Sequence, residues 1–136
     1  WGNEIKKGAV DDSGVIFAVD FYPSLCAMAG IEPEKNVSFH GADMSLALTG
    51  KKEMKRNELI YWDFGRNEYF HFPKAPHKSP HLAVRDGDWK LLCNSDGSET
   101  ELYNIVNDKH EINNLAGLYP DMVNELKQKL IEWYHQ

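Results

Sequence analysis

Residues 82–92 read Leu-Ala-Val-Arg-Asp-Gly-Asp-Trp-Lys-Leu-Leu, and this stretch decides the fold of the chain. Two runs of strand-forming residues lie on either side of an Asp-Gly-Asp segment. An Asp-Gly pair between two such runs is a strong short-range signal for a β-hairpin. The sequence therefore predicts two antiparallel strands joined by a tight turn at Asp86-Gly87.

Segments on both sides extend this hairpin. Leu59 to Trp62 upstream and Glu101 to Ile105 downstream are rich in residues that favour strands. The last segment predicts an amphipathic helix, because Pro120 suits a first helical position and an apolar stripe recurs at helical spacing. The stripe consists of Met122, Leu126, Leu130 and Trp133. Such a stripe needs a sheet or a helix to cover it, so we expect a two-layer α+β fold.

The N-terminal part predicts short helices separated by loops. Residues 20–29 suit a helix in which Asp20 is the N-cap and Gly30 ends the last turn. A second short helix is expected from Asp43 to Leu48, stopped by Gly50. Residues 51–57 are interpreted as a charged, exposed connector, and residues 65–80 as a long irregular loop.

Composition narrows the class of protein. The chain has 136 residues, which suits one domain, and a net charge of -6. This acidic balance argues against a nucleic-acid partner, and no apolar run is long enough for a membrane-spanning helix. The chain starts without Met or a signal peptide, so we expect a fragment of a longer protein. Cys26 and Cys93 are interpreted as buried free thiols.

Two groups of residues invite a chemical interpretation. Asp11-Asp12 offers paired carboxylates for a hard cation, but the following Ser13-Gly14 favours a solvated turn. A second group is a local cluster of basic residues in residues 66–81. Its members are Arg66, His71, Lys74, His77, Lys78 and His81.

The basic cluster has two open interpretations. His77 and His81 are four residues apart, but Pro76 and Pro80 exclude a helix that would present both to one metal ion. The cluster could line a cleft for an anionic ligand, or it could be a solvated loop. No phosphate-binding glycine loop and no serine elbow are found in the sequence. The residues alone therefore contain no complete catalytic set.

The order of several short motifs resembles the C-terminal part of a sulfatase of the arylsulfatase family. The resemblance covers nearly the whole chain. It is carried by motifs at five places: Trp1-Gly2-x-x-Ile5-x-x-Gly8; Asp20-Phe21-Tyr22-Pro23-Ser24-Leu25 followed by Ala29-Gly30-Ile31; Gly41-x-Asp43-Met44-Ser45 to Gly50; Ala83 to Leu91 with Glu101 to Asn104; and Asp108-x-x-Glu111-x-x-Asn114-Leu115.

The resemblance implies an architecture. Residues 51–136 would form a C-terminal sulfatase subdomain, a small four-stranded antiparallel sheet packed on a C-terminal helix. The implied strands are 59–64, 82–86, 89–93 and 101–105, and the implied helix is 120–134. Residues 1–50 would be the tail of the large catalytic domain, with short helices left over from it.

The resemblance also implies a chemistry whose catalytic residues lie elsewhere. Sulfatases use a formylglycine made within Cys/Ser-x-Pro-x-Arg and a divalent cation, usually calcium. Neither Cys26 nor Cys93 begins that motif. Asp11-Asp12 lies in the wrong place for the family's metal-binding pair. Formylglycine and calcium are therefore expected in the full-length protein, and neither catalytic nor metal-binding residues are expected in this chain.

These implications give the first functional hypothesis. The chain would be the C-terminal fragment of a periplasmic or secreted sulfatase, inactive alone, whose partners are the missing N-terminal domain and a sulfated glycan or aryl sulfate. Arg66, His71, His77 and His81 would contact substrate. Residues 15–31 would expose an apolar patch or hide it by self-association. The alternative is a free-standing, non-catalytic binding or interaction module.

Overall fold

The computed structural model describes residues 5–12, 14–32, 34–36, 38–64 and 78–136. The chain forms two compact units, Trp1–Arg56 and Asn57–Gln136. Within the described residues, no helix is both long and apolar enough to cross a membrane.

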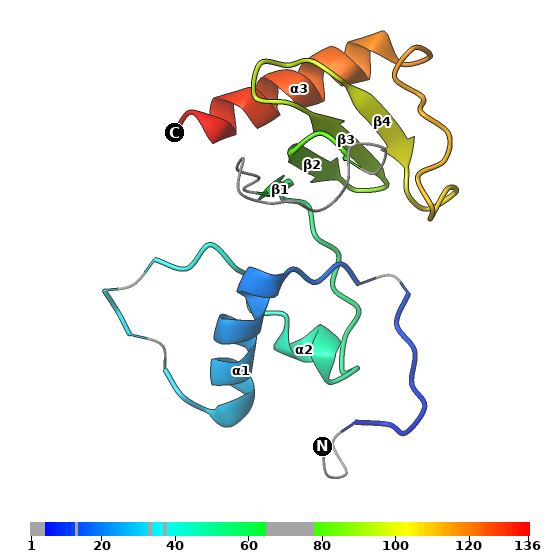
Figure 1. Ribbon diagram of the computed structural model, residues 1–136. Coiled ribbons are helices and arrows are strands. Elements are labelled where there is room, and N and C mark those ends of the chain that lie inside the picture. The colour runs from blue at the N-terminus through cyan, green and yellow to red at the C-terminus, as the bar shows by residue number, and fades with distance from the viewer. Residues whose placement is uncertain (1–4, 13, 33, 37, 65–77) are drawn as a thin grey trace. The chain divides into compact units, whose positions relative to one another are not determined.

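The C-terminal unit is built on a four-stranded sheet (Figure 1). Its strands are β1 (Ile60–Asp63), β2 (Leu82–Asp86), β3 (Trp89–Cys93) and β4 (Glu101–Asn104). They follow one another in the order β1-β2-β3-β4, and every neighbouring pair is antiparallel. The predicted α+β class and the four-stranded sheet are confirmed.

The two strands of the β2–β3 hairpin have the expected ranges, and the turn lies one residue after the Asp86-Gly87 pair. Asp86 pairs with Trp89 as part of the ladder, so that Gly87 and Asp88 form the turn. Gly87 has a φ of 54°. The primed turns that match the twist of paired strands need a positive φ in this place, and glycine adopts it without steric strain.

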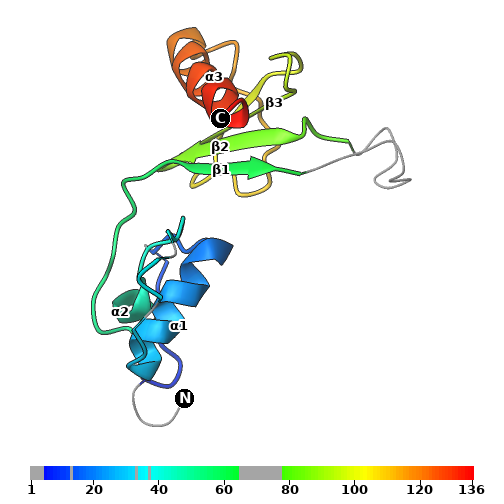
Figure 2. The ribbon, with the colours of Figure 1, turned by 90° about the vertical axis from the view of Figure 1, so that its left-hand side faces the viewer.

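Helix α3 (Pro120–Tyr134) packs across one face of the sheet (Figure 2). The core between the two layers consists of Leu82, Val84, Leu91, Cys93 and Leu102 from the strands, and Val123, Leu126 and Leu130 from α3. Tyr61 and Trp133 stack at the edge of this core, with ring centroids 5.0 Å apart and planes 8° from parallel. The apolar stripe of α3 is therefore covered by the sheet, as expected from its helical spacing.

The opposite face of the sheet carries a smaller apolar cluster of Ala83, Leu92 and Tyr103. These side chains alternate along the strands with those of the main core, because successive residues of a strand point to opposite faces. The sheet is therefore apolar on both faces. The cluster also places the Tyr103 hydroxyl beside Glu101, to which it donates a hydrogen bond of 3.1 Å.

The N-terminal unit contains η1 (Ala18–Asp20), α1 (Phe21–Ala29) and α2 (Ser45–Leu48). The helix predicted over residues 20–29 is confirmed, and it ends at Gly30 in the left-handed conformation, with φ 68°. Asp20 stands at the N-cap position of α1, as predicted, but its side chain makes no capping hydrogen bond there. Its carboxylate instead accepts hydrogen bonds from the backbone N–H groups of Phe17 and Ala42, which lie outside α1.

Two further predictions need correction. The segment 51–57 was expected to be exposed, but the side chain of Arg56 is only 9% exposed, because it pairs with buried Asp20. Both cysteines are free thiols, as predicted, and Cys93 is buried in the main core. Cys26 is only partly buried, since it lies on a side of α1 that the unit does not fully cover.

Candidate functional site

His81 is the one predicted substrate contact within the described residues. Arg66, His71 and His77 lie outside them. His81 immediately precedes β2, and its backbone carbonyl accepts a hydrogen bond from the N–H of Phe64 (2.9 Å). This bond continues the β1–β2 ladder by one step and fixes the position of the His81 backbone.

The ring of His81 meets the C-terminal end of α3. It lies edge-on to Tyr134, with ring centroids 6.2 Å apart and planes at 72°. Tyr134 in turn contacts His135 at 5.3 Å and 65°. Imidazole N–H and phenol O–H groups donate hydrogen bonds, and a protonated imidazole adds positive charge. This group of three side chains, the His81 group, could therefore bind the oxygens of an anion or a sugar.

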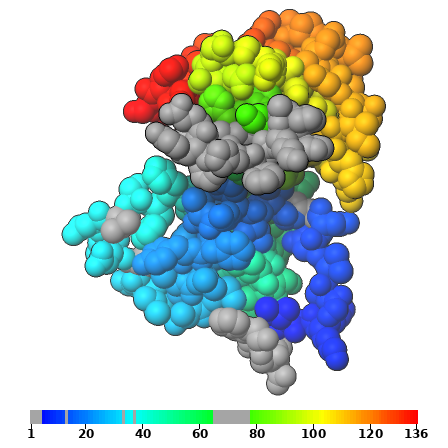
Figure 3. All heavy atoms as spheres, viewed as in Figure 1, coloured from blue at the N-terminus to red at the C-terminus, as the bar shows by residue number. Residues whose placement is uncertain are grey.

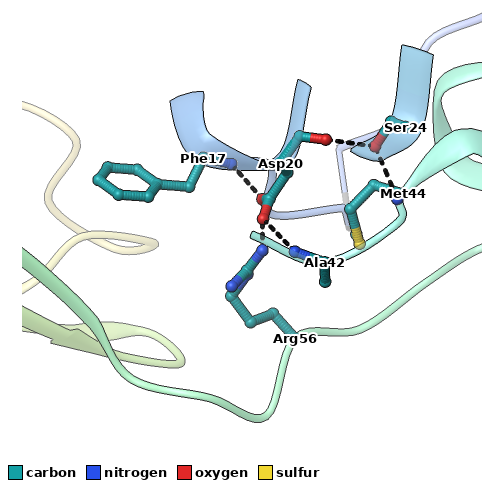
Figure 4. Close-up of polar contacts among 6 residues, drawn as sticks. All are labelled: Phe17, Asp20, Ser24, Ala42, Met44 and Arg56. Carbon is teal, nitrogen blue, oxygen red and sulfur yellow. Dashed lines mark hydrogen bonds and ion pairs between the residues drawn. The ribbon is translucent and has the colours of Figure 1, made fainter. Parts of the chain in front are cut away.

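A second polar site lies inside the N-terminal unit and was not predicted from the sequence. We call it the Asp20 cluster; Figure 4 shows its six residues: Phe17, Asp20, Ser24, Ala42, Met44 and Arg56. The carboxylate of Asp20 is fully buried. It accepts hydrogen bonds from the N–H of Phe17 (2.7 Å) and of Ala42 (2.9 Å), and it forms an ion pair with Arg56.

Ser24 extends the cluster by one helical turn. Its hydroxyl donates to the carbonyl oxygen of Asp20 (2.6 Å) and accepts from the N–H of Met44 (2.8 Å). The N–H of Met44 thus has a partner although its residue is buried. The two polar side chains, at positions 20 and 24, tie α1 to the segment that leads into α2 (Figure 4).

The surroundings of Asp20 keep it ionised. Burial alone would raise the pKa of its carboxyl, because it disfavours the charged form. The hydrogen bonds from Phe17 and Ala42 and the nearby guanidinium of Arg56 outweigh burial and lower the pKa below its usual value. Three donors are thus directed at one carboxylate, which explains why a charge is tolerated at a fully buried position.

The Asp20 cluster holds the N-terminal unit together. Asp20 joins residue 17 before η1, residue 42 before α2 and residue 56 at the end of the unit. The signal in the sequence was a single carboxylate directly before a helix without charged residues. That position led to the N-cap prediction, because sequence spacing does not show which distant backbone groups reach the carboxylate.

The turn from Asp108 to Asn114 serves the C-terminal unit in a similar way. Oδ2 of Asp108 accepts from the N–H groups of Ile112 and Asn113 (2.9 and 2.8 Å). Glu111 pairs through both oxygens with Nζ of Lys90 on β3, at 2.8 Å each.

Asn114 then reaches the edge strand. Its Oδ1 accepts from the N–H of Leu102 (3.1 Å) and of Ala116 (2.9 Å), while the N–H of Leu115 donates to the carbonyl of Leu102 (2.8 Å). These bonds cover the outer edge of β4, so the motif residues 108–115 have a structural role in this unit.

Asp11 and Asp12 lie beside a pocket of about 420 Å³ in the N-terminal unit. Its walls mix apolar side chains with Lys52 and Glu53. Oδ1 of Asp11 accepts a hydrogen bond from the N–H of Gly14 (3.0 Å), which is the geometry of the turn interpretation. In the part of the chain that the structure describes, no three His, Cys, Asp or Glu side chains are arranged to hold a metal ion.

Comparison with known families matches the entire chain, residues 1–136, to the model described as "N-sulphoglucosamine sulphohydrolase, C-terminal". The chain belongs to this family of sulfatase C-terminal domains. The resemblance to sulfatases read from the short motifs is thereby confirmed.

Curated relatives of this sulfatase domain are much longer than the chain. It is 29% identical over 132 residues to human arylsulfatase K, covering 95% of this chain and 24% of that protein. It is 28% identical over 120 residues to arylsulfatase K of Xenopus laevis, covering 87% and 22%. A sulfatase of Formosa agariphila is 27% identical over 139 residues, covering 95% and 25%. The chain thus spans about a quarter of the length of these relatives.

Solved structures show the same fold. The Bacteroides fragilis protein yidJ, assigned as a sulfatase, superposes with a TM-score of 0.66 at 20% identity, over 99% of this chain and 28% of that one. A structure solved with D-glucosamine-2-N,6-O-disulfate, described as its substrate, has a TM-score of 0.54 at 27% identity, over 83% of this chain and 22% of that one. These matches identify the two described units as parts of a sulfatase fold.

Proposed function

We propose that this chain is the C-terminal part of a sulfatase that hydrolyses sulfate esters. The observation that carries this proposal is the match of all 136 residues to a sulfatase C-terminal family. The relatives that share this region are arylsulfatases and sulfatases about four times as long.

In this proposal, residues outside this chain carry out the step that breaks the sulfate ester. No Cys or Ser of these 136 residues begins a Cys/Ser-x-Pro-x-Arg motif, so a formylglycine has no position among them. The carboxylate that is fully buried, Asp20, is already bonded to two backbone N–H groups and Arg56. We therefore assign no catalytic step to this chain, and calcium and formylglycine remain proposals for the longer protein.

The contribution that we propose for this chain is structural support and substrate contact. The His81 group supports the second part, because it offers hydrogen-bond donors at the junction of β2 and α3. Arg66, His71 and His77 are proposed as further contacts on sequence grounds. Sulfate oxygens accept such bonds, and cationic side chains balance the sulfate charge.

A sulfated sugar is the substrate class that we favour. The structure solved with a sulfated glucosamine is 27% identical to this chain over 83% of its length. A second structure, of Ps i-CgsB in complex with a neocarrahexaose, is 25% identical over 84% of the chain with a TM-score of 0.61. Both ligands are sugars. Because several relatives are named arylsulfatases, an aryl sulfate is the substrate with which a sulfated sugar is compared.

The test is a pair of sulfate-release assays. The 136-residue chain and the longer polypeptide encoded around it would each be incubated with calcium, a sulfated glycosaminoglycan oligosaccharide and an aryl sulfate. We expect no release by the chain alone and release from the sugar by the longer protein. Metal-dependent turnover by the chain alone, or a gene without an upstream Cys/Ser-x-Pro-x-Arg, would contradict the proposal.

His81 is tested within the active longer protein. His81→Phe keeps an aromatic ring against Tyr134 but removes the imidazole nitrogens, so we expect a higher KM with an unchanged melting temperature. His110→Ala, at an exposed turn position, is the matched control and is expected to leave KM unchanged. An unchanged KM for His81→Phe would remove His81 from the substrate contacts.

We also propose that the longer protein is exported to the periplasm or the medium. Cell fractionation tests this localisation.

A further inference from the structure

The turn between β3 and β4 begins directly across the sheet from His81. The antiparallel register pairs Leu82 with Cys93, so the next step of this ladder places His81 opposite Asn94, the first residue of the turn. Side chains at facing positions of antiparallel strands have Cβ atoms about 5 Å apart. The β3–β4 turn is therefore a close neighbour of the His81 imidazole.

Hydrogen bonds within this turn fix the position of one carboxylate, that of Asp96. The N–H of Asn94 donates to the carbonyl of Ser98 (3.0 Å), and the N–H of Gly97 donates to the carbonyl of Asn94 (2.8 Å). Oδ1 of Asp96 accepts a hydrogen bond from the N–H of Ser98 (2.9 Å). The turn thus holds a carboxylate in place at an exposed position.

Helix α3 contacts both the turn and His81. A Cβ at Gly97 would lie 3.6 Å from Cδ of Lys127, so the turn packs on the stem of that lysine. His81 meets Tyr134, which lies seven positions after Lys127 and hence on the same side of the helix, about 10 Å along its axis. In Figure 3, yellow-green atoms from this part of the sequence lie beside the red C-terminal end of α3.

The charges around His81 differ in sign. Asp96 is negative, whereas α3 brings the positive charge of Lys127 and the second imidazole of His135 to the same side. The hydrogen bonds from Ser98 lower the pKa of the Asp96 carboxyl most, and the positive charge of His81 lowers it further. Attraction between opposite charges is mutual, so the Asp96 carboxylate in turn favours the charged imidazole.

We propose that Asp96 is a positioning residue, which from the β3–β4 turn favours the protonated form of the His81 imidazole. This inference rests on the proposed function, in which the His81 group contacts a sulfated sugar. A protonated imidazole donates hydrogen bonds from both nitrogens and balances part of the sulfate charge, whereas a neutral one donates from one nitrogen. Asp96 acts through His81 and does not touch the substrate, because a carboxylate repels sulfate.

The test uses variants of the longer polypeptide encoded around this chain. Asp96→Asn removes the charge but preserves the turn, because the asparagine oxygen can still accept from the N–H of Ser98. Asp96→Glu retains the charge and is the conservative variant. Asp88→Asn is the matched control, since Asp88 is also an exposed aspartate in a hairpin turn, at the other end of β3.

The protonated fraction of His81 is measured first, in the absence of substrate. NMR of the protein with carbon-labelled histidine is recorded at a pH of about 6.5, the ordinary midpoint of imidazole titration. The His81 signal is identified by its loss in His81→Phe. We expect Asp96→Asn to move this signal toward that of neutral imidazole, and Asp96→Glu and Asp88→Asn to leave it near the parent position. The same signal position in the parent protein and in Asp96→Asn would overturn the proposal.

The KM for the sulfated sugar is then measured at the same pH. We expect Asp96→Asn to raise KM about two- to fivefold with an unchanged kcat, which is the size of effect typical of an exposed charge pair. The difference should vanish at alkaline pH, where the imidazole is neutral in both proteins. In a His81→Phe background, Asp96→Asn should leave KM unchanged, because the group through which it acts is gone. An equal rise of KM in that background would overturn the proposal.

The two measurements separate this inference from the proposed function. A displaced NMR signal in a protein that releases no sulfate supports the role of Asp96 and contradicts the proposed function. A displaced signal with an unchanged KM supports the role of Asp96 and contradicts the substrate contact proposed for His81. An unmoved signal in a protein that releases sulfate overturns the role of Asp96 and leaves the proposed function standing.

Discussion

The guanidinium of Arg56 pairs with the buried carboxylate of Asp20, although the two residues are 36 positions apart in the sequence. The pair joins the start of α1 to the last residue of the N-terminal unit. Breaking a buried pair by removing one charge leaves the other charge buried without a partner.

Asp20→Asn is therefore expected to destabilise the N-terminal unit by about 3–5 kcal/mol, as measured by denaturant unfolding with hydrogen exchange resolving each unit. Asp12→Asn, at an exposed position, is the control and is expected to have little effect. The double variant Asp20→Asn with Arg56→Met removes both charges and is expected to recover part of the loss. Equal stability of Asp20→Asn and the parent protein would show that the pair contributes nothing.

Acid is expected to unfold the same unit through the same carboxylate. The pKa of Asp20 is lowered in the folded chain; burial opposes this, and the hydrogen bonds from Phe17 and Ala42 and the charge of Arg56 outweigh it. A group whose folded pKa is depressed stabilises the fold above its unfolded pKa, and this contribution is lost as the pH falls through the folded value.

The loss therefore begins near the ordinary aspartate pKa of 3.8 and continues below it. Hydrogen exchange at decreasing pH would show α1 opening in the parent protein. In Asp20→Asn, the hydrogen exchange of α1 should change less between neutral pH and this acid range, because the titrating carboxyl is gone. An identical acid profile in both proteins would contradict the assignment to Asp20.

Gly41→Ala is expected to disrupt the N-terminal unit for a different reason. A Cβ at position 41 would lie 2.0 Å from the carbonyl oxygen of Val19 and 2.7 Å from the backbone nitrogen of Asp20. Because both contacts are with backbone, a side-chain movement cannot relieve them. Overpacking of this kind costs typically about 1–3 kcal/mol.

Gly117→Ala is the matched control, since a Cβ there meets nothing within 4 Å. We expect it to keep the parent melting temperature, whereas Gly41→Ala lowers it and weakens the protection of the Ala42 amide. A melting temperature for Gly41→Ala equal to that of Gly117→Ala would show that the two segments do not approach each other this closely.

Asn114→Ala tests the edge of the sheet. The side-chain oxygen of Asn114 accepts from Leu102 and Ala116, so its removal leaves two backbone N–H groups without this partner. Leaving a buried donor unsatisfied costs about 1–3 kcal/mol. We expect faster exchange of the Leu102 amide and a lower melting temperature, while Asn124→Ala on the exposed side of α3 changes neither. Unchanged Leu102 exchange would contradict the proposed edge contact.

The hydroxyl of Tyr103 is expected to ionise well above the ordinary tyrosine pKa. Burial and then the charge of Glu101, which accepts its hydrogen bond, raise the pKa of Tyr103 to about 12. The raised pKa contributes stability below the unfolded value of 10.0, and this contribution is lost as the pH rises through the folded value. An NMR titration of the protein with carbon-labelled tyrosine measures the pKa of Tyr103. Glu101→Gln removes a negative charge beside the hydroxyl and should lower this pKa. A titration of Tyr103 near its ordinary pKa would contradict this prediction.

The sequence predicted much of the C-terminal unit because its signals are local. The Asp-Gly turn places two strands beside each other, and the spacing from Met122 to Trp133 gives α3 its apolar side. The predicted range of each strand agreed with the observed one to within a residue at each end. The turn of the hairpin lies one position after the Asp86-Gly87 pair, because Asp86 extends the β2–β3 ladder by pairing with Trp89.

The family, too, could be read from the order of short motifs, and the match of the entire chain confirms it. Of the four predicted substrate contacts, the structure describes His81 alone, and its neighbour Tyr134 was not foreseen because it lies at the other end of the unit's sequence. Substrate binding by these residues stays a prediction.

Turn residues and apolar periodicity act over a few positions, so the sequence was enough to predict which segments become strands and helices. The roles of Asp20 and Arg56, in contrast, depend on contacts that form when the chain folds. A carboxylate before a helix can cap it or bond to distant groups, and the outcome depends on which donors the folded chain brings within reach. The same fold turned Ser24 inward and left Phe21 and Leu25 exposed. That apolar patch was expected from the family resemblance, because helical spacing alone does not show which side of α1 faces the unit.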